Sequence, residues 1–442
     1  MTKEKSKGNQ ITEGIIWQQL LFFFFPILFG TFFQQLYNAA DAMIVGRFVG
    51  KEALSAVGGS TSMLTQLIVG FFVGLSSGAS VIVSQYYGAK REEMVGYAVH
   101  TAITASVISG AVLMVIGFVG APFALNAMGT PEDIVGFATL YMRIYFLGTI
   151  ANLIYNIGSG ILRAVGDSKR PLYFLIASCF TNIILDIVFV VYFHMGIAGA
   201  ALATIISQCV SAFLVIWVLM RTSDMYQLHF SKLGLDMRML KRIVRIGLPS
   251  GLQSAMYTTS NIIIQSSVNS LGTDTVAAWA AYGKIDVIFW MIISAFSISV
   301  TTFVGQNYGA GKMDRVRKGI RVCLGMSFVT TLFLSLFLYN FGQYIFQIFT
   351  TDPAVLTIGM DVLHYLVPTF FTGSLKGIGD SWFPMFLTMT GVCALRVLWL
   401  LLYVPHHRNI YAIIFTYPLT WVVTSILFLI YFHGFSPMRK IR

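Results

Sequence analysis

Three carboxylates lie well inside long apolar stretches of the sequence: Asp41, Asp186 and Asp286. Nearly all of the other acidic residues fall in the more polar segments between or beyond those stretches. An ionisable side chain is costly to keep inside a membrane, so each of the three indicates a functional role. A structural hydrogen bond across helices is the alternative for each of them.

Asp41 shares one helical face with two polar residues before it. It follows Tyr37 by four residues and Gln34 by seven, and these spacings bring side chains to the same side of a helix. Pro26 lies further back in the same apolar stretch, where it removes a backbone hydrogen bond and permits a kink. The kink is either a fixed bend or a hinge that responds to Asp41.

A second polar face surrounds Asp186, with Asn182 one turn before it. On the following helix, Ala200, Thr204 and Gln208 form one stripe among small residues that allow close helix approach. If these helices converge on the first one, two carboxylates, an amide and a hydroxyl come together. Such a group can take up and release a proton, or share a Na⁺ through oxygen ligands.

The composition sets the environment of these residues. The 442-residue chain is 56% hydrophobic and only 11% charged, with a mean hydropathy of +0.76. Soluble domains are about a quarter charged, so this chain is embedded in the lipid bilayer. We predict an all-α membrane protein with twelve spans, each long enough to cross a hydrocarbon core of about 30 Å. The predicted spans are residues 16–43, 54–82, 96–120, 134–158, 172–193, 196–220, 245–268, 276–303, 320–341, 355–373, 384–404 and 410–432.

The net charge of +11 is explained by membrane orientation. If the N-terminus is cytoplasmic, the tails, the even-numbered connections and the adjoining helix ends hold 23 of the 29 Lys and Arg residues. Only Arg47, Lys51 and Arg408 fall on the opposite side. This positive-inside asymmetry places both termini in the cytoplasm and needs no nucleic-acid partner.

No enzyme, cofactor or resident metal is predicted. The segment GLSSG at 74–78 matches a nucleophile-elbow pattern, but it falls inside a predicted helix and has no His or Asp placed to serve it. The segment YGAGKM lacks the Walker spacing. The four cysteines lie in apolar spans without CxxC spacing, which predicts core packing.

The chain contains an internal repeat. SQYYGAK at 84–90 reappears as GQNYGAG at 305–311, and LRAVGDSKRP at 162–171 reappears as LKGIGDSWFP at 375–384. Both pairs fall in basic connections after an even number of spans, which predicts two parallel six-helix lobes with a cavity between them. The predicted parts are an N-terminal lobe, a cytoplasmic linker and a C-terminal lobe, at residues 1–220, 221–244 and 245–442.

The two copies are unequal in length. Pro131 to Gly166 is 35 residues, whereas the corresponding Pro353 to Gly379 is 26, so the tenth helix (about 354–375) has lost about nine residues. That removes roughly 13 Å of helix. Whether the protein is competent with this shortened helix is left open by the sequence.

The charges of the two copies differ as well. The repeat position of Asp41 holds Asn261 or Ile263, depending on a one-residue gap, and Arg396 or Trp399 lies near that of Asp186. The second lobe instead carries Lys284, Asp286 and Arg396, whose roles are either substrate or ion coupling or structural pairing across helices.

Taken together, these motifs resemble the multidrug and toxic compound extrusion (MATE) family over essentially the whole chain. The resemblance implies a V-shaped, twelve-helix antiporter that exports cationic, amphipathic compounds in exchange for H⁺ or Na⁺. In the DinF-like branch the coupling site lies in the N-terminal lobe, and that branch's first helix bends at its proline, here Pro26, on protonation. The family's coupling residues match this sequence at Asp41, Asn182, Asp186 and Thr204, with Ala200 nearby. The NorM-like branch uses acids in the second lobe, and the seventh span here has none.

We therefore expect a monomeric multidrug antiporter of the bacterial inner membrane, with no cofactor beyond a coupling H⁺ or Na⁺. Its substrate-cavity candidates are Gln34, Tyr37, Gln208, Lys284, Asp286 and Arg396. The alternative is a flippase for a lipid-linked oligosaccharide or another polyisoprenoid lipid, which requires a strongly basic cavity for pyrophosphate. A membrane-embedded hydrolase is disfavoured, because no nucleophile and base are suitably placed.

Overall fold

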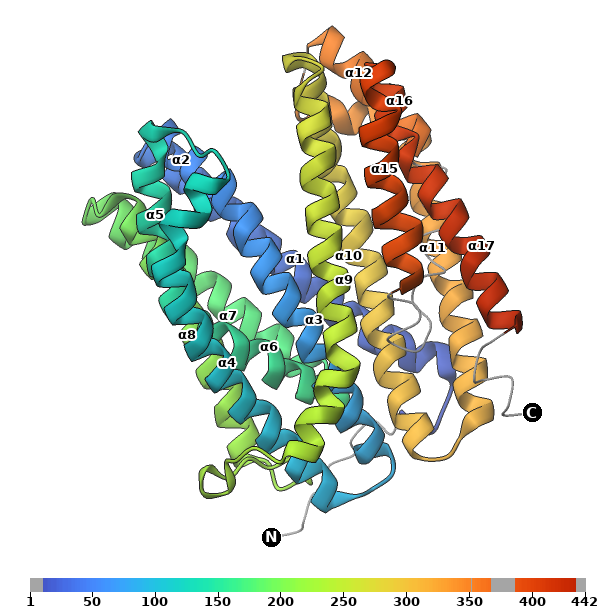
Figure 1. The fold of residues 1–442 in the computed structure, drawn as a ribbon. Coiled ribbons are helices and arrows are strands. Elements are labelled where there is room, and N and C mark those ends of the chain that lie inside the picture. The colour runs from blue at the N-terminus through green and yellow to red at the C-terminus, as the bar shows by residue number, and fades with distance from the viewer. Residues whose placement is uncertain (1–10, 351, 367–385, 435–442) are drawn as a thin grey trace. The chain divides into compact units, whose positions relative to one another are not determined.

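The computed structural model describes residues 11–350, 352–366 and 386–434, and every regular element among them is a helix (Figure 1). The first elements are α1 (Ile16–Phe48), α2 (Lys51–Gly58), α3 (Ser60–Gly88), α4 (Glu92–Ala127), α5 (Glu132–Leu147), α6 (Thr149–Ala164), α7 (Lys169–Asp186), the π-helix η1 (Ile187–Tyr192), α8 (Gly196–Arg221) and the short η2 (Phe230–Lys232). The later ones are α9 (Met237–Asn269), α10 (Thr273–Gly309), α11 (Met313–Gln347), α12 (Pro353–Leu366), the π-helix η5 (Met389–Ala394), α15 (Leu395–Leu402), η6 (Val404–His406), α16 (Ile410–Ile414) and α17 (Thr416–Gly434).

The predicted all-α membrane fold is confirmed. In the described part of the chain, nine helical stretches are long and apolar enough to cross a membrane, and α5 and α6, bent by 51°, make a tenth. The remaining two predicted spans correspond to α9, which is rich in Ser, Thr, Gln and Asn, and to the shorter apolar helix α12.

Helix α12 covers only part of the predicted tenth span. It is 14 residues long, and residues 367–373 of that span lie outside the described residues. The second copy of the GDS motif, at 375–384, also lies outside them. The predicted shortening therefore stays a prediction from the sequence.

Spatial contacts divide the chain into two compact units. Unit 1 contains Met1–Gly251 and Thr301–Arg317, and unit 2 contains Leu252–Val300 and Lys318–Arg442. The predicted lobes rest on the sequence repeat rather than on these contacts, so their boundaries stay a prediction.

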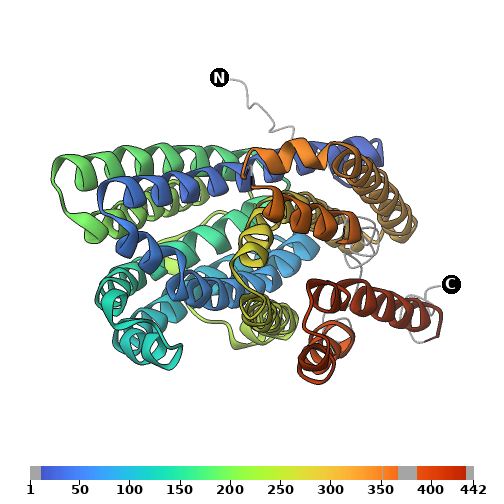
Figure 2. The ribbon, with the colours of Figure 1, turned by 90° about the horizontal axis from the view of Figure 1, so that it is seen from above.

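Unit 1 is built around α7 and α6. Helix α7 packs against α1 and α8, and α6 packs against α3, α4 and α8 (Figures 1 and 2). Aliphatic side chains that are fully buried fill the space between them, among them Val83, Val99, Leu162 and Val215. These contacts fix the relative positions of α1, α7 and α8, which carry the predicted polar faces.

The GLSSG segment lies within α3, where its glycines allow a close helix crossing. A Cβ added at Gly74 would collide with the backbone of Gly251, and one at Gly78 with the backbone of Gly247, both on α9. Small residues at such a crossing let two backbones approach closely. This packing role explains the motif.

The repeated YGA motifs meet each other within unit 1. A Cβ added at Gly88 would collide with the backbone carbonyl of Gln306, and one at Gly309 would collide with that of Gln85. Gln85 and Gly88 stand at the same positions of the first motif as Gln306 and Gly309 in the second. The contact is therefore reciprocal.

The segment just before α1 is also tied to this part of unit 1. The Arg315 guanidinium donates hydrogen bonds to the carbonyl oxygens of Glu13 and Gly14, each at 2.7 Å. Lys312 Nζ donates to the Thr12 carbonyl at 2.9 Å. Because every acceptor is a backbone carbonyl, these hydrogen bonds depend on the backbone conformation of residues 12–14 and not on their side chains.

The segment between α8 and α9 is docked rather than free. The backbone N–H of His229 donates to His100 Nε2 at 3.0 Å, and that of Asp236 donates to Thr101 Oγ1 at 3.2 Å. Burial in this segment raises the pKa of Tyr226 above its ordinary value. The predicted linker thus has a defined structure against α4.

Unit 2 has its own aromatic core. Buried rings from α10, α11 and α17 pack together, among them Phe289, Phe346 and Trp421. A smaller cluster joins α9 to α15 and α16 through Ile264, Leu400 and Ile413. These clusters position the charged residues of the second half.

Candidate functional site

The two carboxylates of unit 1 come together inside the helix bundle. Asp41 on α1 is 6% exposed, and Asp186, the last residue of α7, is fully buried. The two carboxylates are close enough to interact electrostatically. The sequence analysis made a shared site conditional on this convergence, and the packing of α1 on α7 produces it.

Five buried polar atoms of Asp41, Asn182 and Asp186 have no hydrogen-bond partner. Both carboxylate oxygens of Asp186, both side-chain polar atoms of Asn182 and Oδ1 of Asp41 are buried and unpaired. Buried polar groups are normally hydrogen-bonded, and an unpaired group costs about 1–3 kcal/mol, or more when it is charged. A bound proton or cation would offset that cost.

Helix α8 contributes a hydroxyl to the same side of the bundle. The buried Thr204 hydroxyl donates to the carbonyl of Ala200 at 3.0 Å, so its oxygen keeps acceptor capacity for a cation. Helix α8 packs against both α7 and α1. The predicted set is thereby carried by three mutually packed helices.

Two tyrosines of α5 belong to this environment and were missed by the sequence reasoning. Tyr141 interacts electrostatically with both Asp41 and Asp186. It stacks on Tyr145, with ring centroids 6.2 Å apart, and Tyr145 is in hydrogen-bonding contact with Gln208. The four-residue spacing of the two tyrosines was the available signal, because it puts them on one helical face.

A π-helix begins directly after Asp186. The six residues of η1 continue α7 with shifted backbone hydrogen bonds. Short π-helical stretches inside α-helices are frequently found at functional sites. The π-helix therefore marks the position of Asp186, which directly precedes it, as a candidate functional site.

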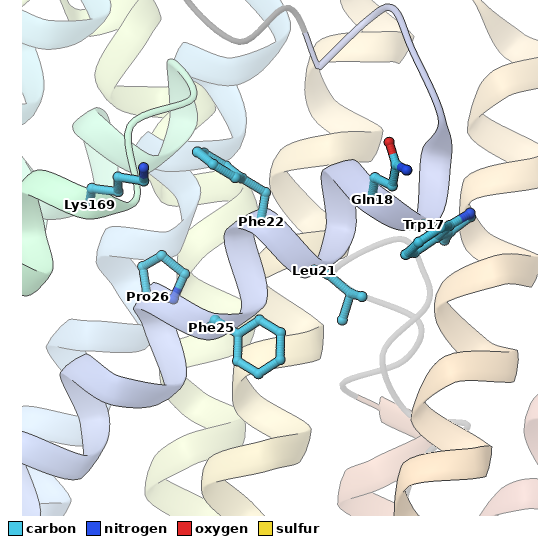
Figure 3. Close-up of a pocket in the computed structure, with 7 residues that line it drawn as sticks. All are labelled: Trp17, Gln18, Leu21, Phe22, Phe25, Pro26 and Lys169. Carbon is cyan, nitrogen blue, oxygen red and sulfur yellow. The ribbon is translucent and has the colours of Figure 1, made fainter.

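The other first-lobe candidates are less closely placed. Tyr37 interacts electrostatically with Asp41 and Tyr145, as its helical face predicts. Gln34 is exposed on α1, and no described contact joins it to the carboxylates. Pro26 lies inside α1, which continues through it as one helix (Figure 3).

In unit 2, the carboxylate of Asp286 is bound by its own helix. The Tyr282 hydroxyl donates to Oδ1 at 3.3 Å, and Trp290 Nε1 donates to Oδ2 at 3.1 Å. Lys284 is exposed, and among the described residues it forms no ion pair with Asp286. The prediction that these two do not face each other agrees with this arrangement.

Arg396 is the largest fully buried side chain in the described chain. Its Nη1 donates to Asn261 Oδ1 at 3.5 Å, and its guanidinium lies 4.4 Å from the ring centroid of Tyr417. It also interacts electrostatically with Asp286. The sequence repeat predicts Asn261 or Ile263 at the position of Asp41, and Arg396 or Trp399 near that of Asp186. The structure brings Asn261 and Arg396 into contact.

Within the described ranges, no group of three or more His, Cys, Asp or Glu side chains could hold a metal ion. Cys179, Cys323 and Cys393 are buried as predicted, but Cys209 is exposed, so the core-packing prediction is wrong for that residue. Its position on the outer face of α8 explains the difference.

Comparisons with known proteins find related sequences and structures. A family model described as MatE matches residues 26–188 and 249–401. The chain is 32% identical to the probable multidrug resistance protein YoeA of Bacillus subtilis (strain 168) over 372 residues, which are 82% of this chain and 78% of the relative.

Two solved structures share the fold. One is a transporter of the MOP superfamily from Pyrococcus furiosus, described as having a binding pocket of reverse polarity that suggests a different function; the TM-score is 0.87 at 22% identity. The other is a multidrug resistance MATE family transporter in an outward-facing conformation, with a TM-score of 0.87 at 23% identity. Each match covers 96% of this chain and 97% of the other.

Proposed function

Since the chain belongs to the MATE family of multi-pass membrane transporters, which are not enzymes, we propose that it exports cationic, amphipathic compounds in exchange for H⁺ or Na⁺. The naming of the relative YoeA as a probable multidrug resistance protein supports the substrate class. The observation that carries the coupling role is the buried pair Asp41 and Asp186, in which both oxygens of Asp186 and Oδ1 of Asp41 lack hydrogen-bond partners.

The mechanism follows from the charge of that pair. When both carboxylates are ionised, they attract a cationic substrate, and nearby aromatic rings such as Tyr37 stack on it. Binding of H⁺ or Na⁺ removes this attraction and the repulsion between the two acids. The ion and the substrate therefore compete for the same charge, and each favours a different conformation of α1.

The protein acts as a monomer in the cell membrane, with both termini in the cytoplasm. The asymmetric distribution of Lys and Arg supports this orientation. The flippase alternative gains no support from the second-half cations, because Lys284 is exposed and Arg396 is engaged by Asn261 and Tyr417.

Efflux from proteoliposomes tests the proposal. Purified protein would be reconstituted into liposomes that contain ethidium. An inward-directed gradient of H⁺ would be imposed in one experiment and an inward-directed gradient of Na⁺ in another. We expect one gradient to drive export, and Asp41→Asn to reduce that export at least ten-fold. Asp133→Asn is the matched control, because Asp133 is exposed at the start of α5 and should leave transport unchanged.

Either of two results would contradict the proposal. If Asp41→Asn exports ethidium at the parental rate, the Asp41 carboxylate does not couple ion entry to export. Export that continues without either ion gradient would remove ion coupling altogether.

A further inference from the structure

A pocket of about 360 Å³ lies beside the start of α1, and the proposed transport cycle does not use it (Figure 3). Six of its seven lining residues lie on α1 between Trp17 and Pro26, and the seventh is Lys169, the first residue of α7. Apart from Lys169 and Gln18, the lining is apolar or aromatic. The pocket thus combines one cation with a long apolar wall.

Lys169 is available to an anion. Its Nζ lies 4.6 Å from the ring centroid of Phe22, and among the described residues no carboxylate pairs with it. The neighbouring Arg170 already pairs with Asp167 at 3.2 Å, which neutralises that acid. Lys169 therefore carries the uncompensated charge at this end of α7.

The position of the pocket is that of a membrane interface. Trp17 and Lys169 both lie at helix ends, where aromatic and basic side chains anchor proteins at the headgroup level. Trp17 and Phe25 are each 49% exposed, and in a membrane that exposed apolar surface faces acyl chains. This inference holds for either orientation of the protein.

We propose that this pocket binds an anionic phospholipid. The phosphate of the headgroup contacts the Lys169 ammonium, and one acyl chain lies along Leu21, Phe25 and Pro26. A free phosphate ion would leave the apolar wall uncovered, and a cationic substrate would be repelled by Lys169. Because Pro26 forms part of the wall, the bound lipid touches α1 at the residue where that helix can bend.

Quenching of tryptophan fluorescence by brominated lipids tests the proposal. The full chain would be placed in nanodiscs containing phosphatidylcholine and increasing fractions of brominated phosphatidylglycerol, or of brominated phosphatidylcholine. The signal of Trp17 is the difference between the parent and Trp17→Phe. We expect phosphatidylglycerol to quench this signal at about five-fold lower mole fraction, the preference that one basic residue near a surface confers.

Substitutions at the cation identify the source of the preference. In Lys169→Gln, the two brominated lipids should quench the Trp17 signal at nearly the same mole fraction, so that the ratio of these mole fractions is close to one. Lys169→Arg should retain the five-fold ratio. Lys232→Gln, which removes an exposed cation outside the pocket, should leave the ratio unchanged. Excess inorganic phosphate should not relieve the quenching.

Equal quenching by the two lipids in the parent protein would overturn the proposal. So would a preference that persists in Lys169→Gln, or quenching that inorganic phosphate or ethidium displaces. None of these readouts depends on transport, so failure here is distinguishable from failure of the proposed antiport.

Discussion

At the scale of single residues, the three membrane aspartates are alike in sequence but have different surroundings. Asp186 has no hydrogen-bond partner for either oxygen, whereas Asp286 accepts from Tyr282 and Trp290. An acid kept without partners is suited to binding a mobile ion, and an acid with two donors is suited to a structural role. We therefore expect neutralisation of Asp186 and neutralisation of Asp286 to change the melting temperature in opposite directions.

Neutralising these acids should separate function from stability. Asp186→Asn removes an unpaired buried charge, so we expect a melting temperature equal to or above that of the parent, together with at least a ten-fold loss of ion-driven efflux. Asp286→Asn weakens two hydrogen bonds to a charged acceptor, each worth about 1.5–3 kcal/mol, so its melting temperature should fall. Thermal unfolding in detergent and efflux in liposomes measure the two properties; shifts of the same sign in both variants would argue against this assignment.

The buried guanidinium of Arg396 should be coupled energetically to Asp286. Arg396→Gln removes a cation that interacts electrostatically with the Asp286 carboxylate, so the free energy of unfolding should fall. Adding Asp286→Asn to Arg396→Gln should recover part of that loss. A double-mutant cycle on the free energy of unfolding measures the coupling, and simple additivity would show that the two groups are independent.

At the scale of elements, the connection after α8 is held by acceptors on α4. His100 Nε2 accepts from the backbone of His229, and its Nδ1 lies 2.7 Å from the Gly96 carbonyl. The His100 ring therefore links the backbone of the connection at His229 to the backbone of its own helix at Gly96. A side chain that hydrogen-bonds to two backbone groups in this way can hold a loop in place even though the loop itself has no helix or strand.

Removing this bridge should loosen the connection locally. In His100→Leu the His229 amide loses its acceptor, so we expect faster hydrogen exchange over residues 224–236 while the helices remain protected. His100→Gln keeps an acceptor of similar reach and should exchange at nearly the parental rate. Hydrogen exchange detected by mass spectrometry resolves this segment, and unchanged exchange in the leucine variant would show that other contacts hold it.

Local patterns predicted most of the elements and half of the site. Helical periodicity and apolar length placed the spans, and face-sharing placed Asn182 beside Asp186; the approach of Asp41 to them was conditional on the packing of two helices. The contribution of Tyr141 could not be predicted, because it depends on how α5 packs in three dimensions. The π-helix after Asp186 was missed for a similar reason, since its backbone shift leaves no mark in residue spacing.

At the scale of the whole molecule, the internal repeat has a structural counterpart in unit 1. Gly88 packs on the carbonyl of Gln306, and Gly309 packs on that of Gln85. The second copy of the motif, although more than 200 residues away in sequence, thus belongs to the same compact unit as the first. The contact ties the end of α10 to the end of α3.

Substitutions at the two motif glycines should have equivalent effects. Gly88→Leu and Gly309→Leu each place a side chain against a backbone carbonyl, which cannot move as a side chain does, so each should lower the melting temperature and reduce efflux. The melting temperature of the double variant should fall by less than the sum of the two single decreases, because moving α3 and α10 apart once relieves both clashes. Gly136→Leu, at a helical glycine of α5 where an added Cβ meets open space, is the control; equal damage from it would point to a general effect of the residue change.

That reciprocal contact has the geometry of an interface between two identical subunits. When two copies of a chain meet across a two-fold axis, residue i of one touches residue j of the other, and j touches i in return. Here both copies belong to one polypeptide, and each motif packs against the other copy of itself. A displacement of either motif therefore changes both contacts at once.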